Sequence, residues 1–298
     1  MNSADGGKTG ADSVGNDFGE EAALRLSRDD RDRFLCTLFA PAERRGALFA
    51  LYDFDLEISR VRDTVSDPMV GQLRLKWWYD AVAAMKSGPP PRHAVAEALY
   101  TAVQTHGLDV DALLRLIEAH AEDLTPVQPE NLDGLAAYAE ATTGVVAAMA
   151  LEILGAGGSE AAQRTASDIA VAAACVRLMR ALPQHARRGW VYLPKDLCAA
   201  AELALDEVRQ MRAGPPMSAV VRPVATYAQE RLRAARARRA ECRSEALPVL
   251  LHGVLADHYL KELQACGYEP SRRRLRRGPD PGPWAMLCLG WRALCRRY

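Results

Sequence analysis

The sequence predicts an all-α protein folded as a single-domain helical bundle. From Leu24 onward, long stretches rich in Ala, Leu, Arg and Glu alternate with short segments that contain Pro or Gly. The alternation of β-branched residues that is typical of strands is nearly absent. The chain has 298 residues, 49% of them apolar, which suffices for a sizeable buried core. No sequence period typical of repeat proteins is found, so a solenoid is not expected.

The elements are expected to follow one another as helices with short breaks. Residues 1–22 are polar and Gly-rich and lack the apolar run of a signal peptide, so we expect a disordered leader, followed by a helical domain over 23–298. Proline removes a backbone donor and glycine frees φ, so helices should end where these residues gather. The expected breaks are Ala40-Pro41, 87–93, 124–134, 155–160, 213–218 and 276–284.

Charge is distributed unevenly along the chain. The formal net charge is zero, but residues 211–298 contain 17 Arg and Lys against 7 Asp and Glu. Such a surface could contact a diphosphate, acidic lipid headgroups or an acidic protein, although a solvated Arg-rich helix face is the simpler interpretation. The basic runs 231–239 and 272–277 lack interleaved aromatic residues, so nucleic acid is not an expected partner.

Cysteine usage and hydropathy indicate the compartment. The seven cysteines are scattered without a C-x-x-C pair, which favours a reducing interior over a disulfide framework or a zinc site. No run of 18 apolar residues predicts a membrane span. We expect a cytoplasmic protein, with peripheral attachment to the inner face of a membrane left open.

Two aspartates form the first candidate metal site. Asp63 and Asp67 are four residues apart, and on one helix their carboxylates would lie about 6 Å from each other and could hold Mg²⁺. Asp67 precedes Pro68, where the helix is expected to end. With Arg60 and Arg62 nearby, the pair could equally be a solvated ion-pair cluster.

Three segments then resemble a known family. "ALFALYDFDLEISRVRD" (47–63), "YAEATTG" (138–144) and "VRLMRALPQHARRGWVYLP" (176–194) are similar to the squalene/phytoene synthase family, and the similarity runs from about Asp29 to Tyr298. The resemblance implies an isoprenoid-synthase-type bundle around a central cavity. Catalytic members of the family join two prenyl diphosphates head to head, with two D-x-x-x-D motifs on facing helices that bind Mg²⁺.

The second of these motifs is incomplete here. The chain retains Arg180, Arg188 and "YLP" (192–194), but Ala181 and His185 occupy the two aspartate positions. Alanine cannot bind a metal, and a neutral imidazole is a poor ligand for a hard cation. The Mg²⁺ site on this helix should therefore be absent.

The first motif is also altered. Alignment on "ALYDF" without a gap places Ser59 and Asp63 at the paired positions, and a shift by one helical turn recovers Asp63 and Asp67. The resemblance identifies no catalytic residue in this sequence. The substrate-binding candidates that it implies are Arg45, Tyr138, Arg180, Arg188 and Tyr192.

The function predicted from the sequence is therefore binding or assembly without catalysis. The segments 56–82, 256–263 and 291–298 resemble the branch of the family that lacks the aspartate-rich motifs and includes an assembly factor for respiratory complex I. The implied partners are a protein, a membrane surface, or a prenyl lipid or prenyl diphosphate, and no cofactor is expected. The alternative is an active Mg²⁺-dependent prenyltransferase that uses Asp63 and Asp67, assisted by Glu57 or Glu140.

Overall fold

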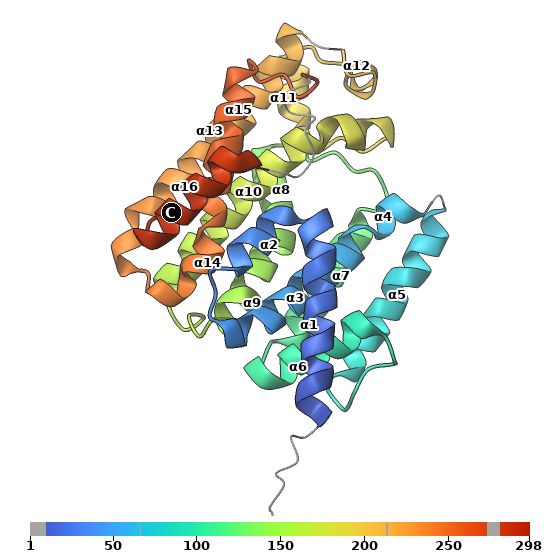
Figure 1. Ribbon diagram of the computed structural model, residues 1–298. Helices are drawn as coiled ribbons and strands as arrows, with labels where there is room; N and C mark the ends of the chain where they lie inside the picture. The colour runs from blue at the N-terminus through green and yellow to red at the C-terminus, as the bar shows by residue number, and fades with distance from the viewer. Residues whose placement is uncertain (1–9, 66, 213, 273–280) are drawn as a thin grey trace, which may run out of the picture.

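Helices make up the regular structure of the computed structural model, which describes residues 10–65, 67–212, 214–272 and 281–298 (Figure 1). Within these ranges there is no strand, so the predicted all-α class is confirmed. The helices of the first half are α1 (Gly10–Asp29), α2 (Arg31–Thr37), α3 (Ala42–Ser59), α4 (Val61–Thr64), α5 (Pro68–Ala84), α6 (Ala94–His106) and α7 (Val110–Glu122).

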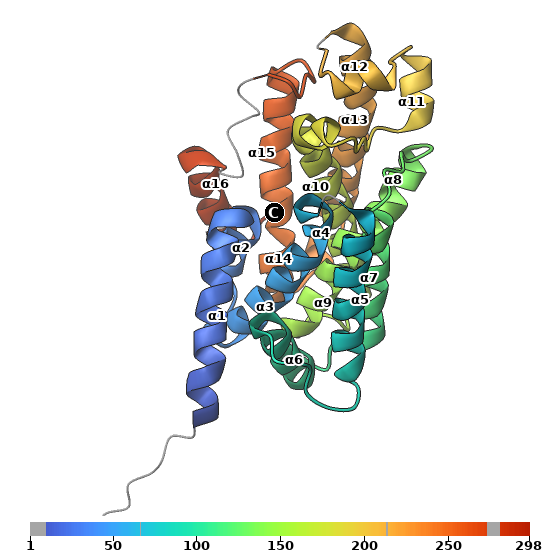
Figure 2. The same cartoon turned by 90° about the vertical axis from the view of Figure 1, so that its right-hand side faces the viewer.

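The second half contains the longest helices. They are α8 (Leu132–Ala139), a π-turn η1 (Glu140–Gly144), α9 (Val145–Ile153), α10 (Glu160–Arg187), α11 (Lys195–Ala200), α12 (Leu205–Arg209), α13 (Pro215–Ala237), the 3₁₀ turns η2 (Arg239–Glu241) and η3 (Ser244–Ala246), α14 (Leu247–Leu250), α15 (His252–Ala265) and α16 (Gly282–Leu294). The long helix α10 runs through the middle of the molecule and packs against α13 and α15 (Figure 2).

Most predicted breaks separate helices in the structure. The segments at 40–41, 87–93 and 155–159 lie between helices, and α8 begins at Leu132, inside the break expected over 124–134. Gly214 precedes α13, while Ala213 and residues 276–280 of the expected breaks lie outside the described residues. Short polar side chains start several helices by accepting hydrogen bonds from the first turn, as Asp109 does for α7 and Ser159 for α10.

The segment between α3 and α5 differs from the prediction. Asp63 lies in the one-turn helix α4, the backbone is extended at Val65, and Asp67 is the N-cap of α5, where its carboxylate accepts a hydrogen bond from the Met69 amide. Pro68 begins a helix here instead of following one, because its fixed φ suits the first helical turn. Asp63 and Asp67 therefore do not share a helix face.

The beginning of the helical domain also differs. The domain was expected from residue 23, but α1 begins at Gly10, and Ala22 and Leu26 are buried where α1 packs against α3. Residues 10–22 of the expected leader are therefore helical, and residues 1–9 lie outside the described residues.

One continuous helical segment, Leu132–Ile153, is long and apolar enough to cross a membrane, which the sequence did not predict. Half of its most apolar window is buried inside the protein, and Thr143, Val146 and Ala147 line an internal pocket. A buried core helix has the same length and composition as a membrane span, so we assign this segment to the core.

Candidate functional site

Two adjoining pockets lie inside the bundle. The first has a cavity volume of about 90 Å³ and is walled by α9, α10 and α15 together with residues of α2 and α3. The second lies beside it, and both are lined by Asp30, Asp32, Arg33, Thr143, Arg177 and Arg180. Together they form one cavity, here called the central cavity.

The first pocket is the apolar end of the central cavity. Small side chains of α10 leave room along one wall, and branched side chains of α9, α14 and α15 supply the others. Its apolar lining is Val146, Ala147, Ala166, Ile169, Ala170, Ala173, Ala174, Val249, Leu255 and Ala256. The segment rich in small residues at 141–144 therefore contributes to a cavity wall, through Thr142 and Thr143, instead of only allowing helices to pack closely.

The second pocket is the polar end. Ser59 and Asp63 line it from α3 and α4, and Ala181 and His185 line it from α10. The four positions that the resemblance aligns with the family's paired aspartates therefore face one space, and Asp63 alone among them carries a carboxylate.

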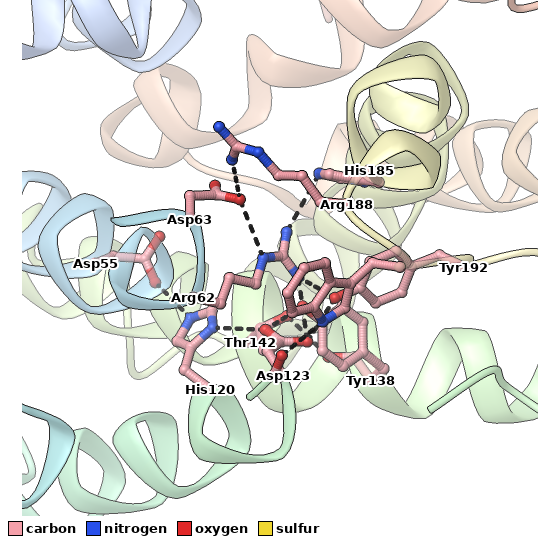
Figure 3. A network of polar contacts seen from close by, with 11 residues as sticks. Asp55, Arg62, Asp63, His120, Asp123, Tyr138, Thr142, His185, Arg188 and Tyr192 are labelled. Carbon is pink, nitrogen blue, oxygen red and sulfur yellow. Dashed lines mark hydrogen bonds and ion pairs between the residues drawn. The ribbon is translucent and has the colours of Figure 1, made fainter. Parts of the chain in front are cut away.

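The guanidinium of Arg62 lies between these facing segments (Figure 3). Its Nη2 lies 3.2 Å from Nε2 of His185, its Nη1 lies 3.3 Å from Oδ1 of Asp123, and its Nε lies 4.0 Å from Oδ1 of Asp63. It also donates a hydrogen bond to the hydroxyl of Tyr192. A single cationic side chain thus connects both halves of the degenerate motif.

Asp123, the C-cap residue of α7, accepts hydrogen bonds from several side chains. Its carboxylate accepts hydrogen bonds from Tyr138 Oη at 2.8 Å and from Tyr192 Oη at 2.7 Å. Its backbone carbonyl accepts one from Trp190 Nε1 at 2.7 Å. Burial would raise the pKa of Asp123, but the hydrogen bond from His120 and the charge of Arg62 outweigh it and hold that pKa below its ordinary value.

His120 links Asp123 to a second buried carboxylate. Its Nδ1 lies 3.2 Å from Asp123 and its Nε2 lies 3.3 Å from Asp55, which also accepts a hydrogen bond of 2.5 Å from Arg33. Burial would lower the pKa of His120, yet the hydrogen bonds to Asp123 and Asp55 raise it. Both ring nitrogens can donate only in the imidazolium form, so positive and negative groups alternate from Arg33 to Arg62.

His185 carries no charge in this arrangement. Burial, followed by the positive charge of Arg62, lowers the pKa of His185 to about 4. A neutral imidazole can accept a hydrogen bond from Arg62 through Nε2. His185 thus accepts from an internal cation at the position that the resemblance aligns with a metal-binding aspartate.

The donor set does not fit Mg²⁺. The carboxylate of Asp63 is 2.6 Å from Arg188 and near Arg62, Asp67 caps α5, and no group of three or more His, Cys, Asp or Glu within the described ranges could hold a metal ion. A guanidinium already lies against Asp63 and Asp123 and would repel a divalent cation placed beside it.

The substrate-binding candidates are not all brought together. Tyr138 and Tyr192 belong to the network around Asp123, and Arg180 lines both pockets with its guanidinium carbon 3.5 Å from the ring centre of Tyr259. Arg188 is half exposed beside Asp63. Arg45 is at the opposite end of α3, about 21 Å along the helix from Ser59, where it donates to the carbonyl of Ala40.

Several residues of the site were missed by reasoning from the sequence. The sequence places Arg62 beside Asp63 as a candidate member of a solvated ion-pair cluster, but only 10% of its side chain is exposed. Arg33, Asp55, His120 and Asp123 come from three different segments, and no spacing pattern in the sequence relates them. The segments that resemble the family were the available signal, because they contain Asp55, Arg62, Tyr138 and Tyr192.

Comparison with known proteins identifies the family pattern. The family model described as Squalene/phytoene synthase matches residues 26–279. The protein named NADH dehydrogenase (ubiquinone) complex I, assembly factor 6, of Bos taurus is 31% identical over 273 residues, which cover 92% of this chain and 81% of that protein.

The sequence match to a phytoene synthase covers less of the chain, whereas a synthase structure superposes over most of it. Phytoene synthase 1, chloroplastic, of Arabidopsis thaliana is 26% identical over 180 residues, which cover 59% of this chain and 42% of that protein. The crystal structure of a dehydrosqualene synthase in complex with ligand superposes with a TM-score of 0.81 at 14% identity, over 95% of this chain and 98% of that one. That likeness shows the shared fold.

Proposed function

The chain belongs to the squalene/phytoene synthase family, and from this premise we propose that it is a non-catalytic member that acts in the assembly of respiratory complex I. The observation that carries the proposal is Arg62, whose guanidinium lies between the facing motif positions. Ionisation of an allylic diphosphate requires strong neutralisation of the departing charge. Here the cation in that place is held by Asp123 instead of being free to bind a diphosphate.

The similarity to assembly factors supports the same proposal. A protein named as assembly factor 6 of complex I matches this chain over 92% of its length, whereas a phytoene synthase matches over 59%. An assembly factor has a protein partner, so we expect the partner to bind the surface of the bundle and not its interior. We place the protein at the membrane that contains complex I, on its cytoplasmic face.

A second candidate function is the binding of a prenyl lipid. The apolar end of the central cavity suits a slender apolar chain. Arg177 and Arg180, which share the boundary between the two pockets with Asp30 and Asp32, supply the cations for an anionic head. This function is compatible with assembly, because a bound lipid could stabilise the partner-binding form. An active Mg²⁺-dependent prenyltransferase has less support, since Asp63 and Asp67 lie in different elements.

Two measurements test the proposal together. In cells that carry this chain, deletion of its gene should lower the NADH:ubiquinone oxidoreductase activity of the membranes and cause subcomplexes to accumulate on native gels. A copy with Asp63→Ala should restore both, because assembly does not use a metal ligand.

The purified protein should also release no diphosphate from farnesyl or geranylgeranyl diphosphate in the presence of Mg²⁺. Diphosphate release that is lost in Asp63→Ala would establish the enzyme instead. Normal activity and assembly of complex I in the deletion strain would contradict the proposed assembly function.

A further inference from the structure

The C-terminal helix α16 presents an unusual apolar face. Trp284, Leu287, Trp291 and Leu294 are 60–86% exposed. Their spacing of three, four and three residues places them on one side of the helix. Large apolar side chains gathered in this way on a water-exposed helix indicate a binding surface. We call these four residues the α16 face.

The opposite side of α16 is fixed to the bundle. Ala285, Leu289 and Ala293 are buried, and α16 packs against α15 at the edge of the molecule (Figure 2). The side chain of Tyr298 is also buried, and its carbonyl accepts a hydrogen bond of 3.2 Å from Arg236. The α16 face is thereby held outward instead of turning inward to complete the core.

The segment that carries this face is positively charged. No Asp or Glu occurs between Pro281 and Tyr298, and Arg296 and Arg297, which follow the helix, are exposed. In the sequence a run of basic residues at 272–277 precedes the helix, although all but its first residue lie outside the described part of the chain.

Other basic residues of the C-terminal third are neutralised within the fold. Arg231 pairs with Glu140 and Asp168, Arg238 also pairs with Asp168, and Arg236 pairs with Asp257. Arg296 and Arg297 remain exposed after α16, as do Arg222, Arg233 and Arg239 elsewhere in this third.

We propose that the α16 face binds the surface of an anionic lipid bilayer, with the helix lying in the plane of the interface. Trp and Leu on one side with Arg nearby is the pattern of interfacial helices, because the indole rings settle at the headgroup level and cations meet acidic headgroups. The proposal goes beyond complex assembly, since it applies to this helix whether or not the central cavity is catalytic.

Flotation of the full-length protein with lipid vesicles tests the proposal. The wild type should float with vesicles of phosphatidylcholine containing phosphatidylglycerol, and less with phosphatidylcholine alone or at high salt. Leu287→Gln/Leu294→Gln should weaken partitioning by about tenfold or more. The matched control is Met69→Gln/Leu73→Gln on α5, where two residues of similar exposure are replaced away from α16; it should stay within about twofold of the wild type.

A second measurement uses the tryptophan fluorescence of the wild type, whose fold no substitution disturbs. Lipids brominated near the headgroup should quench part of the tryptophan fluorescence of the wild type, and the quenching should disappear in Trp284→Phe/Trp291→Phe. Failure of the wild type to float, or equal losses in the α16 and α5 variants, would overturn the proposal. So would a dimer in solution that dissociates in Leu287→Gln/Leu294→Gln, because the face would then bind a second copy of the chain.

Discussion

Arg62 and Asp123 form a buried ion pair, with Nη1 and Oδ1 3.3 Å apart and exposed side-chain fractions of 10% and 6%. The pair joins α4 to the C-terminal end of α7, two segments far apart in the sequence. Its positive member also contacts His185 of α10, so it connects the stability of the protein to the state of its site.

Removal of one member should destabilise the fold. We expect Arg62→Met to lower the free energy of unfolding by about 3 kcal/mol, because the buried Asp123 would lose one of its two cationic partners and keep only His120. Arg62→Met/Asp123→Asn should recover part of that loss. Urea denaturation followed by circular dichroism measures both. The control is Arg60→Met, whose exposed partner Asp29 lies 2.9 Å away and whose loss should cost less than about 1 kcal/mol. Equal effects at Arg62 and Arg60 would mean that the buried pair has no special role.

Restoration of the aspartates alone should not restore a metal site. We expect Ser59→Asp/Ala181→Asp/His185→Asp to bind Mn²⁺, used in place of Mg²⁺, at least about tenfold more weakly than the same variant with Arg62→Met added, since the guanidinium repels the cation. Electron paramagnetic resonance of free Mn²⁺ measures the difference. Equal affinities in the two variants would show that Arg62 moves aside and does not exclude the metal.

A larger side chain at the apolar end should remove lipid binding. Ala173 lines the first pocket, so Ala173→Phe should abolish the thermal stabilisation that geranylgeranyl diphosphate gives to the wild type without Mg²⁺. Ala148 is exposed on the neighbouring helix α9 and does not line this pocket, so Ala148→Phe is the matched control and should retain the shift. Retention in both variants, or absence of any shift in the wild type, would contradict a prenyl-lipid site in the cavity.

Asp32 should make stability depend on pH. Burial, opposed by a hydrogen bond from Tyr259 of 2.6 Å, raises the pKa of Asp32 from 3.8 to about 7. The folded state therefore holds a proton that the unfolded state has lost, so the stabilisation is complete below pH 3.8 and disappears as the pH rises to about 7.

An uncharged replacement of Asp32 tests the predicted direction in which stability changes with pH. Asp32→Asn keeps an acceptor for Tyr259 and cannot ionise, so its melting temperature relative to the wild type should be higher at pH 8 than at pH 5. A constant difference between the variants across that range would mean that Asp32 is ionised throughout.

The sequence predicted the helical class well, because proline and glycine act locally and Ala- and Leu-rich stretches have few alternatives to helix. Positions that face one another could also be predicted, as Ser59, Ala181 and His185 show by lining one pocket. The segment 60–67 was predicted wrongly. A spacing of four between Asp63 and Asp67 implies a shared face only if the helix is continuous, and here the helix ends before Val65.

The polar network around Asp123 could not be predicted from spacing in the sequence, because its members are distant in the chain. His120 and Asp123 look like ordinary residues at the end of an amphipathic helix, and their meaning depends on Asp55 and Arg62, which are distant in the chain. Burial turns these groups into partners, since a charge removed from water must find an opposite one. Burial of a polar residue is a property of the whole fold and leaves little trace in local spacing.

The alternating charges from Arg33 to Arg62 also have a pharmacological consequence. A compound that binds catalytic relatives by bridging their metal ions would find at this site a side chain already satisfied by Asp123 and His185. Inhibitors of catalytic relatives that act by chelating metal should therefore not bind this protein. Compounds that bind only through a long apolar chain should bind this protein and the catalytic relatives alike.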